Sequence, residues 1–488
     1  MDEKNSKIKS GLMDKIVSLA KRRGFVYPGS DIYGGLANTY DYGPAGTELL
    51  RNIRDLWWKK FVTDREDMVG IEASLISHHR IWEASGHTAN FADALLDCKK
   101  CKSRIRADHL IEDWLEKNSP QVKPDQNNSK INNSELNKAI ELKKVEGWST
   151  EKMEEMVKHF KIKCPKCDSF DWTQIRRFNQ LFDVQLGLVE GTAGAGYLRG
   201  ETAQGMFINF KNIIESSRVR LPFGVAQLGK SFRNEITPGN FIHRTIEFEQ
   251  GEIEYFFDPE QSSWEELFEN WKSILWNFVH EQLGIKKENL KWRVHSEEER
   301  SFYSKRTEDL EYNFPYGFKE LWGLAYRADY DLLQHMENSG KDLSITDPYS
   351  GKKIVPHVIE PAVGINRIML MVLCDSYYED EKRVVLKLNP KIAPYKVAVF
   401  PLLANKADLT TKAREVYELL KSRFSVAWDD RGNIGKRYLY QDEIGTPWCI
   451  TIDFQTLEDG TVTLRDRDKM TQVRLHLDSL SVYIQDRL

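Results

Sequence analysis

The stretch from Gly229 to Phe257 places charged residues where a β-strand is normally apolar. Alternation of period two stops at Phe232 and resumes at Phe241 after a turn signal, which predicts a long antiparallel strand pair. Arg233 and Glu235 share a parity in this pattern, so we expect both side chains on one face. An arginine there can neutralise a phosphate, and a carboxylate can hold a metal ion or an amine. A solvated sheet face is the alternative explanation of these charges.

Four cysteines form two CxxC pairs, Cys98 with Cys101 and Cys164 with Cys167. Four thiolates at this spacing can grip a tetrahedral zinc ion, and free thiols are the alternative. Six cysteines in 488 residues fit a metal site in a reducing compartment better than a disulfide framework. The polar segment 119–135 between the pairs is low in apolar residues and is predicted to be disordered. We therefore expect a zinc-stapled insertion with a loose tip.

Helices and strands must position these residues. An amphipathic helix is predicted over 46–63, and its apolar face favours the core over a dimer interface. A strand is expected to follow over 69–76, and a central strand is predicted over 319–335. Glu320 and Arg327 in the central strand are unusual for a core position. Both side chains therefore become candidates for a functional site.

The segment from His357 to Cys374 combines a strand, a break at Pro361 and Gly364, and an apolar helix that contains Arg367. A cation near a helix N-terminus opposes the helix dipole, so we expect Arg367 to have an anionic partner. A salt bridge within the protein is the alternative to a functional role. Glu201 stands at the start of another predicted helix. The dipole would favour a carboxylate there, and the same carboxylate could equally bind an amine.

A domain boundary is predicted near 388–394, where a new pattern of alternating strands and a helix begins. This pattern predicts a compact α/β module. Its run at 435–440, Gly-Lys-Arg-Tyr-Leu-Tyr, mixes cations with aromatic residues and is read as exposed. Such a surface suits unstacked bases, although a solvated basic turn explains it equally well.

Composition limits the class of protein. The chain is 41% hydrophobic and 30% charged, and its length suffices for two or three domains. The formal net charge of -4 means that a polyanionic partner must be held by local basic patches. No apolar run approaches the roughly 20 residues of a membrane span. Asp2, Glu3 and Asp14 argue against a targeting peptide, so we expect a cytoplasmic protein with no membrane partner.

These motifs together resemble those of class II aminoacyl-tRNA synthetases. The resemblance rests on FRNE at 232–235, RxxxF at 244–248 and GxxR at 364–367. More closely, almost the whole chain resembles bacterial-type homodimeric glycyl-tRNA synthetases. The strings that support this likeness include WEASGH, CKKCKSRIRADHLIE, GETAQG, GKSFRNEITPGNFI, ELWGLAYRADYDL, HVIEP, GKRY and QDEIGTP.

The resemblance implies an α+β fold, in which helices flank an antiparallel sheet of six to seven strands and an α/β domain binds the anticodon. It implies glycyl-adenylate formation from glycine and ATP, transfer to tRNA(Gly), a homodimer, Mg²⁺ with the ATP, and structural Zn²⁺. The expected division is catalytic core over 1–96 and 173–388, zinc-binding insertion over 97–172, and anticodon-binding domain over 389–488.

The resemblance also assigns residues. Arg233, Glu235 and Arg367 are expected to be catalytic. The residues expected at ATP and magnesium are Arg233, Asn234, Glu235, Arg244, Phe248, Glu320, Leu321, Gly364 and Arg367. The residues expected at glycine are Arg106, Glu201, Phe248, Glu249, Gln250, Glu252, Glu360, Ala362 and Gly364. Cys98, Cys101, Cys164 and Cys167 are the expected zinc ligands.

Several positions depart from the family pattern. They are His79, Asp183, Val184, Gly200, Ile246, Ala362, Leu439 and Tyr440. The hydroxyl missing at 362 and the cation missing at 246 remove expected glycine and ATP contacts, and the last two positions remove expected tRNA contacts. Two other hypotheses therefore stand beside glycine activation: an RNA-binding or accessory paralogue with weakened aminoacylation, and a class II synthetase for another amino acid.

Overall fold

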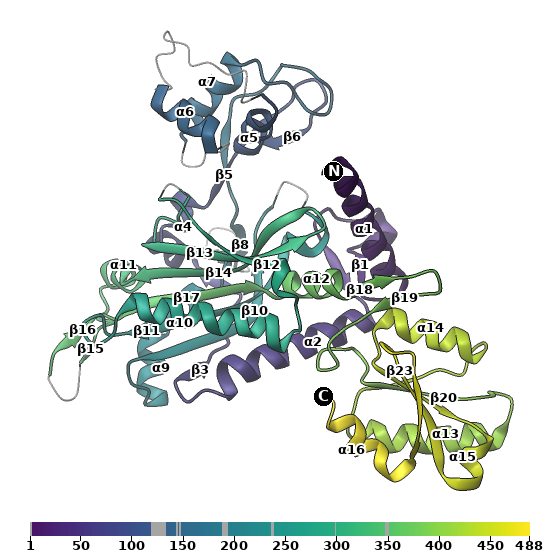
Figure 1. Cartoon of the computed structure of the whole chain (residues 1–488). Helices are drawn as coiled ribbons and strands as arrows, with labels where there is room; N and C mark the ends of the chain where they lie inside the picture. The colour runs from purple at the N-terminus through teal and green to yellow at the C-terminus, as the bar shows by residue number, and fades with distance from the viewer. Residues whose placement is uncertain are drawn as a thin grey trace.

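The computed structural model describes residues 2–118, 133–142, 145, 148–187, 194–235, 239–297, 299–346 and 351–488. Residues 119–132 of the predicted loose tip lie outside these ranges, and 133–135 begin helix α6 (Asn133–Leu142). Figure 1 shows a central sheet region, with the segment that carries α5, α6 and α7 at one end and the C-terminal module with α13 to α16 at another.

Seven strands form the central sheet in the order β12-β13-β14-β17-β11-β10-β3. Their bounds are β3 (Met68–Gly70), β10 (Phe223–Phe232), β11 (Glu247–Phe257), β12 (Leu290–Val294), β13 (Arg306–Phe314), β14 (Gly317–Ala328) and β17 (His357–Gly364). Neighbours are antiparallel except for β3, which pairs in parallel with β10. The predicted strand pair is β10 with β11, in register from Phe223 opposite Phe256 to Phe232 opposite Glu247.

Alternate residues of β11 face two different layers of helices. Ile253 and Phe257 join the core with α2 (Pro44–Trp58), α10 (Trp264–Asn277) and α12 (Ile365–Ser376). Phe256 packs instead against the layer of α8 (Ala203–Ile208), α9 (Phe210–Ser217) and α11 (Tyr330–Ser339). The helix predicted over 46–63 is confirmed as a core helix, since α2 continues into a π-helical turn at Lys59–Thr63 whose Phe61 is fully buried.

The structure corrects several predicted boundaries. Strand β11 begins at Glu247 and not at Phe241, because Phe241–His243 form a 3₁₀ turn. The strand expected over 69–76 is two short strands, β3 and β4 (Ile76–His78), which lie in different sheets. The central strand ends at Ala328, because α11 takes the chain from Tyr330. Strand β17 runs through Pro361, and the predicted break comes only at Gly364, after which α12 begins.

The insertion has a hydrophobic cluster of its own, with Leu96, Ile111, Leu115 and Met156 among its buried members. Its elements are β5 (Ala92–Asp97), β6 (Arg104–Arg106), β7 (Arg176–Asn179), α5 (Ala107–Asn118), α6 and α7 (Thr150–His159). Figure 1 shows that β5 leads into this segment from the central region. In the sequence, α5 ends just before the predicted tip and α7 follows it.

The C-terminal module is a five-stranded mixed sheet in the order β21-β20-β22-β23-β24. Its elements are β20 (Val397–Pro401), α13 (Ala407–Lys421), β21 (Val426–Trp428), α14 (Ile434–Ile444), β22 (Trp448–Ile452), α15 (Phe454–Asp459), β23 (Thr461–Asp466), β24 (Gln472–His476) and α16 (Leu480–Gln485). The run at 435–440 lies in α14 and is not a turn, although Gly435, Lys436 and Leu439 in it are exposed. Arg437 is only 2% exposed, because the first turn of α14 packs against the end of β20.

The remaining α-helices and strands of the described chain are outside these units. They are α1 (Asp2–Arg22), β1 (Val26–Pro28), β2 (Tyr40–Tyr42), α3 (His79–Ala84), α4 (His87–Asn90), β8 (Phe182–Leu186), β9 (Gly194–Leu198), β15 (Ile345–Thr346), β16 (Lys353–Ile354), β18 (Tyr377–Glu379) and β19 (Val384–Leu386). Across the ranges described, every helix is too short or too polar to cross a membrane.

Candidate active site

A cavity of about 280 Å³ lies over β11, β14 and β17 of the central sheet. Its wall combines the ends of these strands with the loop that joins β10 to β11 and the first turn of α12. The predicted site residues that line it are Glu201, Arg233, Glu235, Arg244, Phe248, Gln250, Glu252, Glu320, Glu360, Ala362, Gly364 and Arg367. Residues that are as far as 166 positions apart in the sequence, Glu201 and Arg367, are therefore brought to one place.

One end of the cavity gathers guanidinium groups beside carboxylates. Arg367 Nη1 lies 2.8 Å from Glu320 Oε1, which confirms the anionic partner expected for Arg367. Arg244 Nε lies 3.6 Å from Glu235 Oε1. The guanidinium of Arg233 lies 5.2 Å from the centre of the Phe248 ring. Arginines can bind phosphate oxygens bidentately, and the carboxylates can hold a cation that bridges them.

Strand parity does not explain the position of Arg233 and Glu235, because β10 ends at Phe232. Backbone and side-chain contacts of the loop hold Arg233 instead. Its backbone N–H donates to the carbonyl of Ile246 at 2.9 Å, and its Nε donates to the carbonyl of Gly200 at 3.0 Å. The prediction that the two side chains lie together is nevertheless consistent with the cavity wall, where both are found.

The other end of the cavity gathers buried carboxylates around Arg327. Arg327 Nη1 lies 2.9 Å from Glu360 Oε2, and its Nε lies 2.7 Å from Asp331 Oδ2. Glu201 Oε2 lies 3.1 Å from His87 Nε2. Glu252 accepts from the backbone N–H of Thr202 at 2.9 Å and from its hydroxyl. Three carboxylates of this group, Glu201, Glu252 and Glu360, reach the cavity.

Neighbouring charges shift the pKa values of two of these carboxylates in opposite directions. Burial opposes ionisation of Glu201, but His87 and Arg327 lower the pKa of Glu201 below its usual range. Burial and the charge of Glu201 raise the pKa of Glu252. This buried group holds more carboxylates than cations, so it favours a small cation such as an ammonium group.

Four predicted site residues are not part of the cavity wall that the described residues form. Glu249 has the opposite parity to Phe248 and Gln250, and it pairs with Arg54 of α2 at 2.5 Å. The structure therefore does not support its predicted contact with glycine. Arg106 pairs with Asp93 at 2.9 Å and with Asp108 at 2.5 Å. Asn234 donates its backbone N–H to Gln180, and Leu321 is buried in the core.

Three of the departures have a clear structural setting. A Cβ at Gly200 would meet Leu181 Cδ2 at 2.9 Å, so the glycine fits a tight position behind Arg233. Ile246 serves through its backbone, since its N–H donates to Asn38 at 3.0 Å and its carbonyl accepts from Arg233. Its side chain does not contribute to the described cavity wall, whereas Ala362 does.

Sequence reasoning missed two residues that hold the carboxylate group. His87 is buried against Glu201, and the only signal for it was its place at the end of the string WEASGH. Asp331 accepts from Arg327 on two oxygens, but it was read as part of a strand. His295 and Asp309 also line the cavity, with their side chains 2.7 Å apart, and no motif pointed to them.

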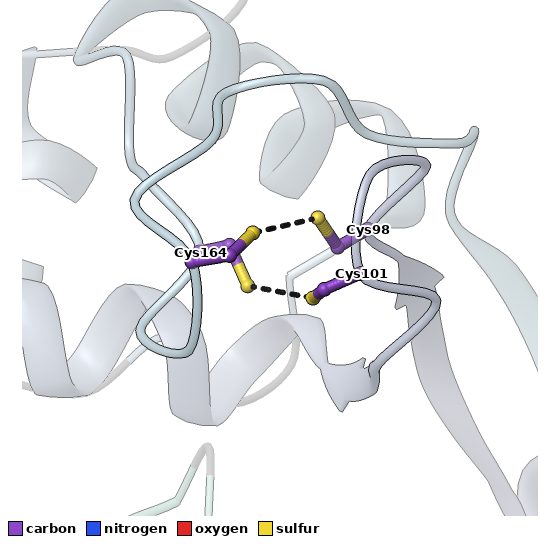
Figure 2. Close-up of side chains that lie close together, drawn as sticks. Cys98, Cys101 and Cys164 are labelled. Carbon is purple, nitrogen blue, oxygen red and sulfur yellow. Dashed lines mark hydrogen bonds between the residues drawn. The ribbon is translucent and has the colours of Figure 1, made fainter.

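The two CxxC pairs converge as predicted. Sγ atoms of all four cysteines lie within 4.8 Å of one another. The sulfurs of Cys98 and Cys167 are 3.5 Å apart, and those of Cys101 and Cys164 are 3.7 Å apart. Figure 2 shows Cys98, Cys101 and Cys164 pointing toward one another from two facing loops. A tetrahedral zinc ion with four thiolate ligands fits this donor set.

The sheet, its cavity and the C-terminal module define a class II aminoacyl-tRNA synthetase. Family models agree: residues 194–376 match "tRNA synthetase class II core domain (G, H, P, S and T)", and 396–487 match "Anticodon binding domain". Residues 93–180 match "Glycyl-tRNA synthetase insertion domain 1". The α+β class II fold predicted from the sequence is therefore confirmed.

Relatives identify the family within this class. The chain is 50% identical over 480 residues to the glycine--tRNA ligase of Caldanaerobacter subterraneus subsp. tengcongensis, with 98% of each chain covered. It is 50% identical to the glycine--tRNA ligase of Clostridium acetobutylicum and 47% identical to that of Clostridium perfringens, again over 98% of each chain. The chain belongs to the glycine--tRNA ligase family, and the predicted aminoacyl-tRNA ligase is confirmed.

Proposed function

We propose that this chain activates glycine with ATP and transfers it to the 3′ end of tRNA(Gly). The observation that carries the proposal is a single cavity with arginines at one end and buried carboxylates at the other. A nucleoside triphosphate suits the end with the arginines, and the ammonium group of an amino acid suits the end with the buried carboxylates. The reacting carboxylate of glycine then lies between them, where it can attack the α-phosphorus as pyrophosphate leaves.

In this proposal the chain supplies position and charge and needs no covalent nucleophile. Arg233 contacts the α-phosphate and stabilises the charge that develops during attack, while Phe248 stacks on adenine. Arg244 and Arg367 hold the β- and γ-phosphates. Glu235 and Glu320 would hold Mg²⁺, which neutralises phosphate charge when it is bound. The arginine and carboxylate contacts at that end of the cavity support these assignments.

Glycine is held by charge and selected by size. Glu201, Glu252 and Glu360 would accept hydrogen bonds from its ammonium group, with Gln250 beside them. Each charge-assisted hydrogen bond contributes roughly 1.5 to 3 kcal/mol, so a few suffice for a substrate without a side chain. An added methyl group would cost on the order of 1 to 3 kcal/mol in a closed pocket, which disfavours alanine.

Further assignments complete the proposal. Cys98, Cys101, Cys164 and Cys167 would bind Zn²⁺ as a structural ion in the insertion, because their sulfurs already converge. The module at 389–488 would bind the tRNA anticodon, as its match to an anticodon-binding family supports. We also propose a cytoplasmic homodimer with the domain division 1–96, 97–172, 173–388 and 389–488, in line with the family resemblance.

Glycine-dependent exchange between ATP and pyrophosphate tests this function. With zinc-loaded protein, we expect glycine-dependent exchange to be at least about tenfold faster than exchange driven by alanine or serine. Charging of tRNA(Gly) with labelled glycine should follow. Exchange driven better by alanine or serine would point to another amino acid. Tight tRNA binding without glycine or ATP binding in calorimetry would instead identify an RNA-binding paralogue.

A further inference from the structure

Glu254 lies behind the carboxylates that face the cavity. It is fully buried on β11 and has the same parity as Glu252, so both side chains leave the strand on one face. The register pairs Glu252 with Ala362 and Tyr255 with Ile359, which places Glu254 opposite Glu360. Glu252 and Glu360 line the cavity, but Glu254 is not part of the described wall. Glycine would therefore meet Glu360 before it could meet Glu254.

Glu254 differs from its neighbours in its hydrogen bonds. Glu360 accepts from Arg327, and Glu252 accepts from Thr202. Asp331 accepts from Arg327 and from Gln204, and Glu201 is paired with His87. In the part of the chain that the structure describes, neither carboxyl oxygen of Glu254 has a hydrogen-bond partner. An ionised carboxylate left in this way would carry the full cost of desolvation.

The charges around Glu254 make ionisation still less favourable. One oxygen from each of Glu252, Glu254 and Glu360 lies within 4.8 Å of the other two. The residue opposite on β10 is Val225, which brings no charge. The titratable or charged groups around it are Glu252 of β11, Glu360 of β17, Arg327 of β14 and Asp331 of α11, with Glu201, His87 and Tyr303 beyond them. Carboxylates thus outnumber the cations, and like charges opposite each other destabilise a sheet.

We propose that Glu254 is a permanently protonated carboxylic acid that donates a hydrogen bond to the carboxylate of Glu360 and so positions Glu360 for the ammonium group of glycine. In this proposal Glu360 would have two donors: Arg327, whose Nη1 donates to it at 2.9 Å, and Glu254, which lies opposite it in the register. Burial and then the charge of Glu360 raise the pKa of Glu254 well above its usual range, and burial raises the pKa of Glu360 as well, although its ion pair with Arg327 opposes that shift. Glu254 acts through Glu360 and is a positioning residue.

The protonation of Glu254 can be measured without substrate. The infrared C=O stretching band of a protonated carboxylic acid should be present in wild-type protein at neutral pH. The band should shift in D₂O. It should appear when the spectrum of Glu254→Gln is subtracted from that of the wild type, because glutamine has a similar shape but ends in an amide. A spectrum in which Glu254→Gln removes no such band would overturn the proposal. This measurement does not depend on the proposed function. The positioning role of Glu254, in contrast, rests on that function.

Kinetics test the positioning role. Because an amide can still donate to Glu360, we expect Glu254→Gln to change the KM for glycine by less than about twofold. Glu254→Leu removes the donor but fills the space with an uncharged group, so the chain should still fold and the KM should rise by about tenfold. Glu360→Gln is the comparison, with a rise of about tenfold or more. KM for ATP should change in none of the three.

Two kinetic results would overturn the proposal. If Glu254 is an anionic ligand of glycine, Glu254→Gln raises the KM for glycine as far as Glu360→Gln does. If Glu254 only fills space, Glu254→Leu keeps the wild-type KM. Absence of glycine-dependent exchange in wild-type protein would refute the proposed function instead, while the infrared result would still decide whether Glu254 is protonated.

Discussion

Arg367 Nη1 lies 2.8 Å from Glu320 Oε1 and joins the first turn of α12 to strand β14 at the cavity wall. A cation at a helix N-terminus is unfavourable, and this carboxylate offsets that cost. The Glu320 side chain is 47% exposed and that of Arg367 is 20% exposed, so both can still reach a ligand in the cavity. The pair thus offers a guanidinium for phosphate oxygens and a carboxylate for Mg²⁺ at one place.

Replacement of Arg367 with glutamine should lower kcat for glycine-dependent exchange by about 10² to 10³-fold, the usual effect of losing one donor to transition-state charge. Arg431→Gln is the matched control, because its side chain is 84% exposed in the C-terminal module and exchange does not use the tRNA. Steady-state exchange with ATP varied at saturating glycine provides the measurement. Equal rates for the two variants would contradict a phosphate contact for Arg367.

Replacement of His87 with glutamine should make glycine activation more sensitive to acid. Burial disfavours ionised Glu201, and His87 with Arg327 lowers the pKa of Glu201 against that effect. Without His87 this pKa rises, so protonation of Glu201 begins at a higher pH as the pH falls. We expect the acid limb of kcat/KM for glycine to move to higher pH, with a loss of about tenfold at its acid end.

The pH profile should be recorded from about pH 4 to 9, which includes the ordinary pKa of a glutamic acid, toward which the pKa of Glu201 should rise. His159→Gln provides the control, because His159 is an exposed histidine of α7 in the insertion. The KM for ATP should stay unchanged in both variants. An acid limb that stays in place in His87→Gln would mean that His87 does not keep Glu201 ionised.

The chemistry-bearing residues were predictable where their signal was local. The CxxC spacing fixes two thiols in one turn, so convergence of Cys98 and Cys101 with the second pair required only that the loops meet. The partner of Arg367 was predictable because helix dipole and burial both demand an anion. Resemblance to a family supplied the remaining site residues, and most of those lie in the cavity wall.

Other features depend on long-range packing that local patterns do not encode. Arg233 and Glu235 lie beyond the end of β10, where period two no longer applies and loop contacts decide direction. Glu249 faces Arg54 because neighbouring residues of a strand leave on opposite faces. The basic run at 435–440 looked exposed, but Arg437 is buried by carbonyl groups that the sequence pattern cannot locate.

Replacement of Cys98 with serine should weaken zinc binding by at least about a hundredfold, since even outer partners of metal ligands are worth 10- to 100-fold. Metal analysis of purified protein should show a fall from about one zinc ion per chain. Proteolysis within 97–172 should become faster. Cys449→Ala is the control, because this buried cysteine lies in the C-terminal module, away from the cluster. Unchanged zinc content in Cys98→Ser would argue against four-cysteine ligation.

Arg437 and Lys436 are adjacent on α14, but their substitutions should have different effects. A change at Arg437 should alter stability, and a change at Lys436 should alter tRNA binding. Arg437 donates from Nη1 to Pro401 at 2.5 Å and from Nη2 to Asp430 at 3.0 Å and Gly432 at 2.8 Å, all backbone carbonyls. Arg437→Gln leaves some of these buried acceptors unpaired, which should lower the free energy of unfolding by about 2 to 4 kcal/mol.

Lys436 is exposed, so Lys436→Gln should change that free energy by less than about 0.5 kcal/mol. If α14 faces tRNA, Lys436→Gln should still make tRNA binding less sensitive to salt. The slope of the logarithm of the binding constant against the logarithm of salt concentration should fall by about one unit. Urea unfolding followed by circular dichroism, and tRNA binding at several salt concentrations, separate the two effects. A wild-type urea midpoint for Arg437→Gln together with weaker tRNA binding would return Arg437 to the role of an RNA contact.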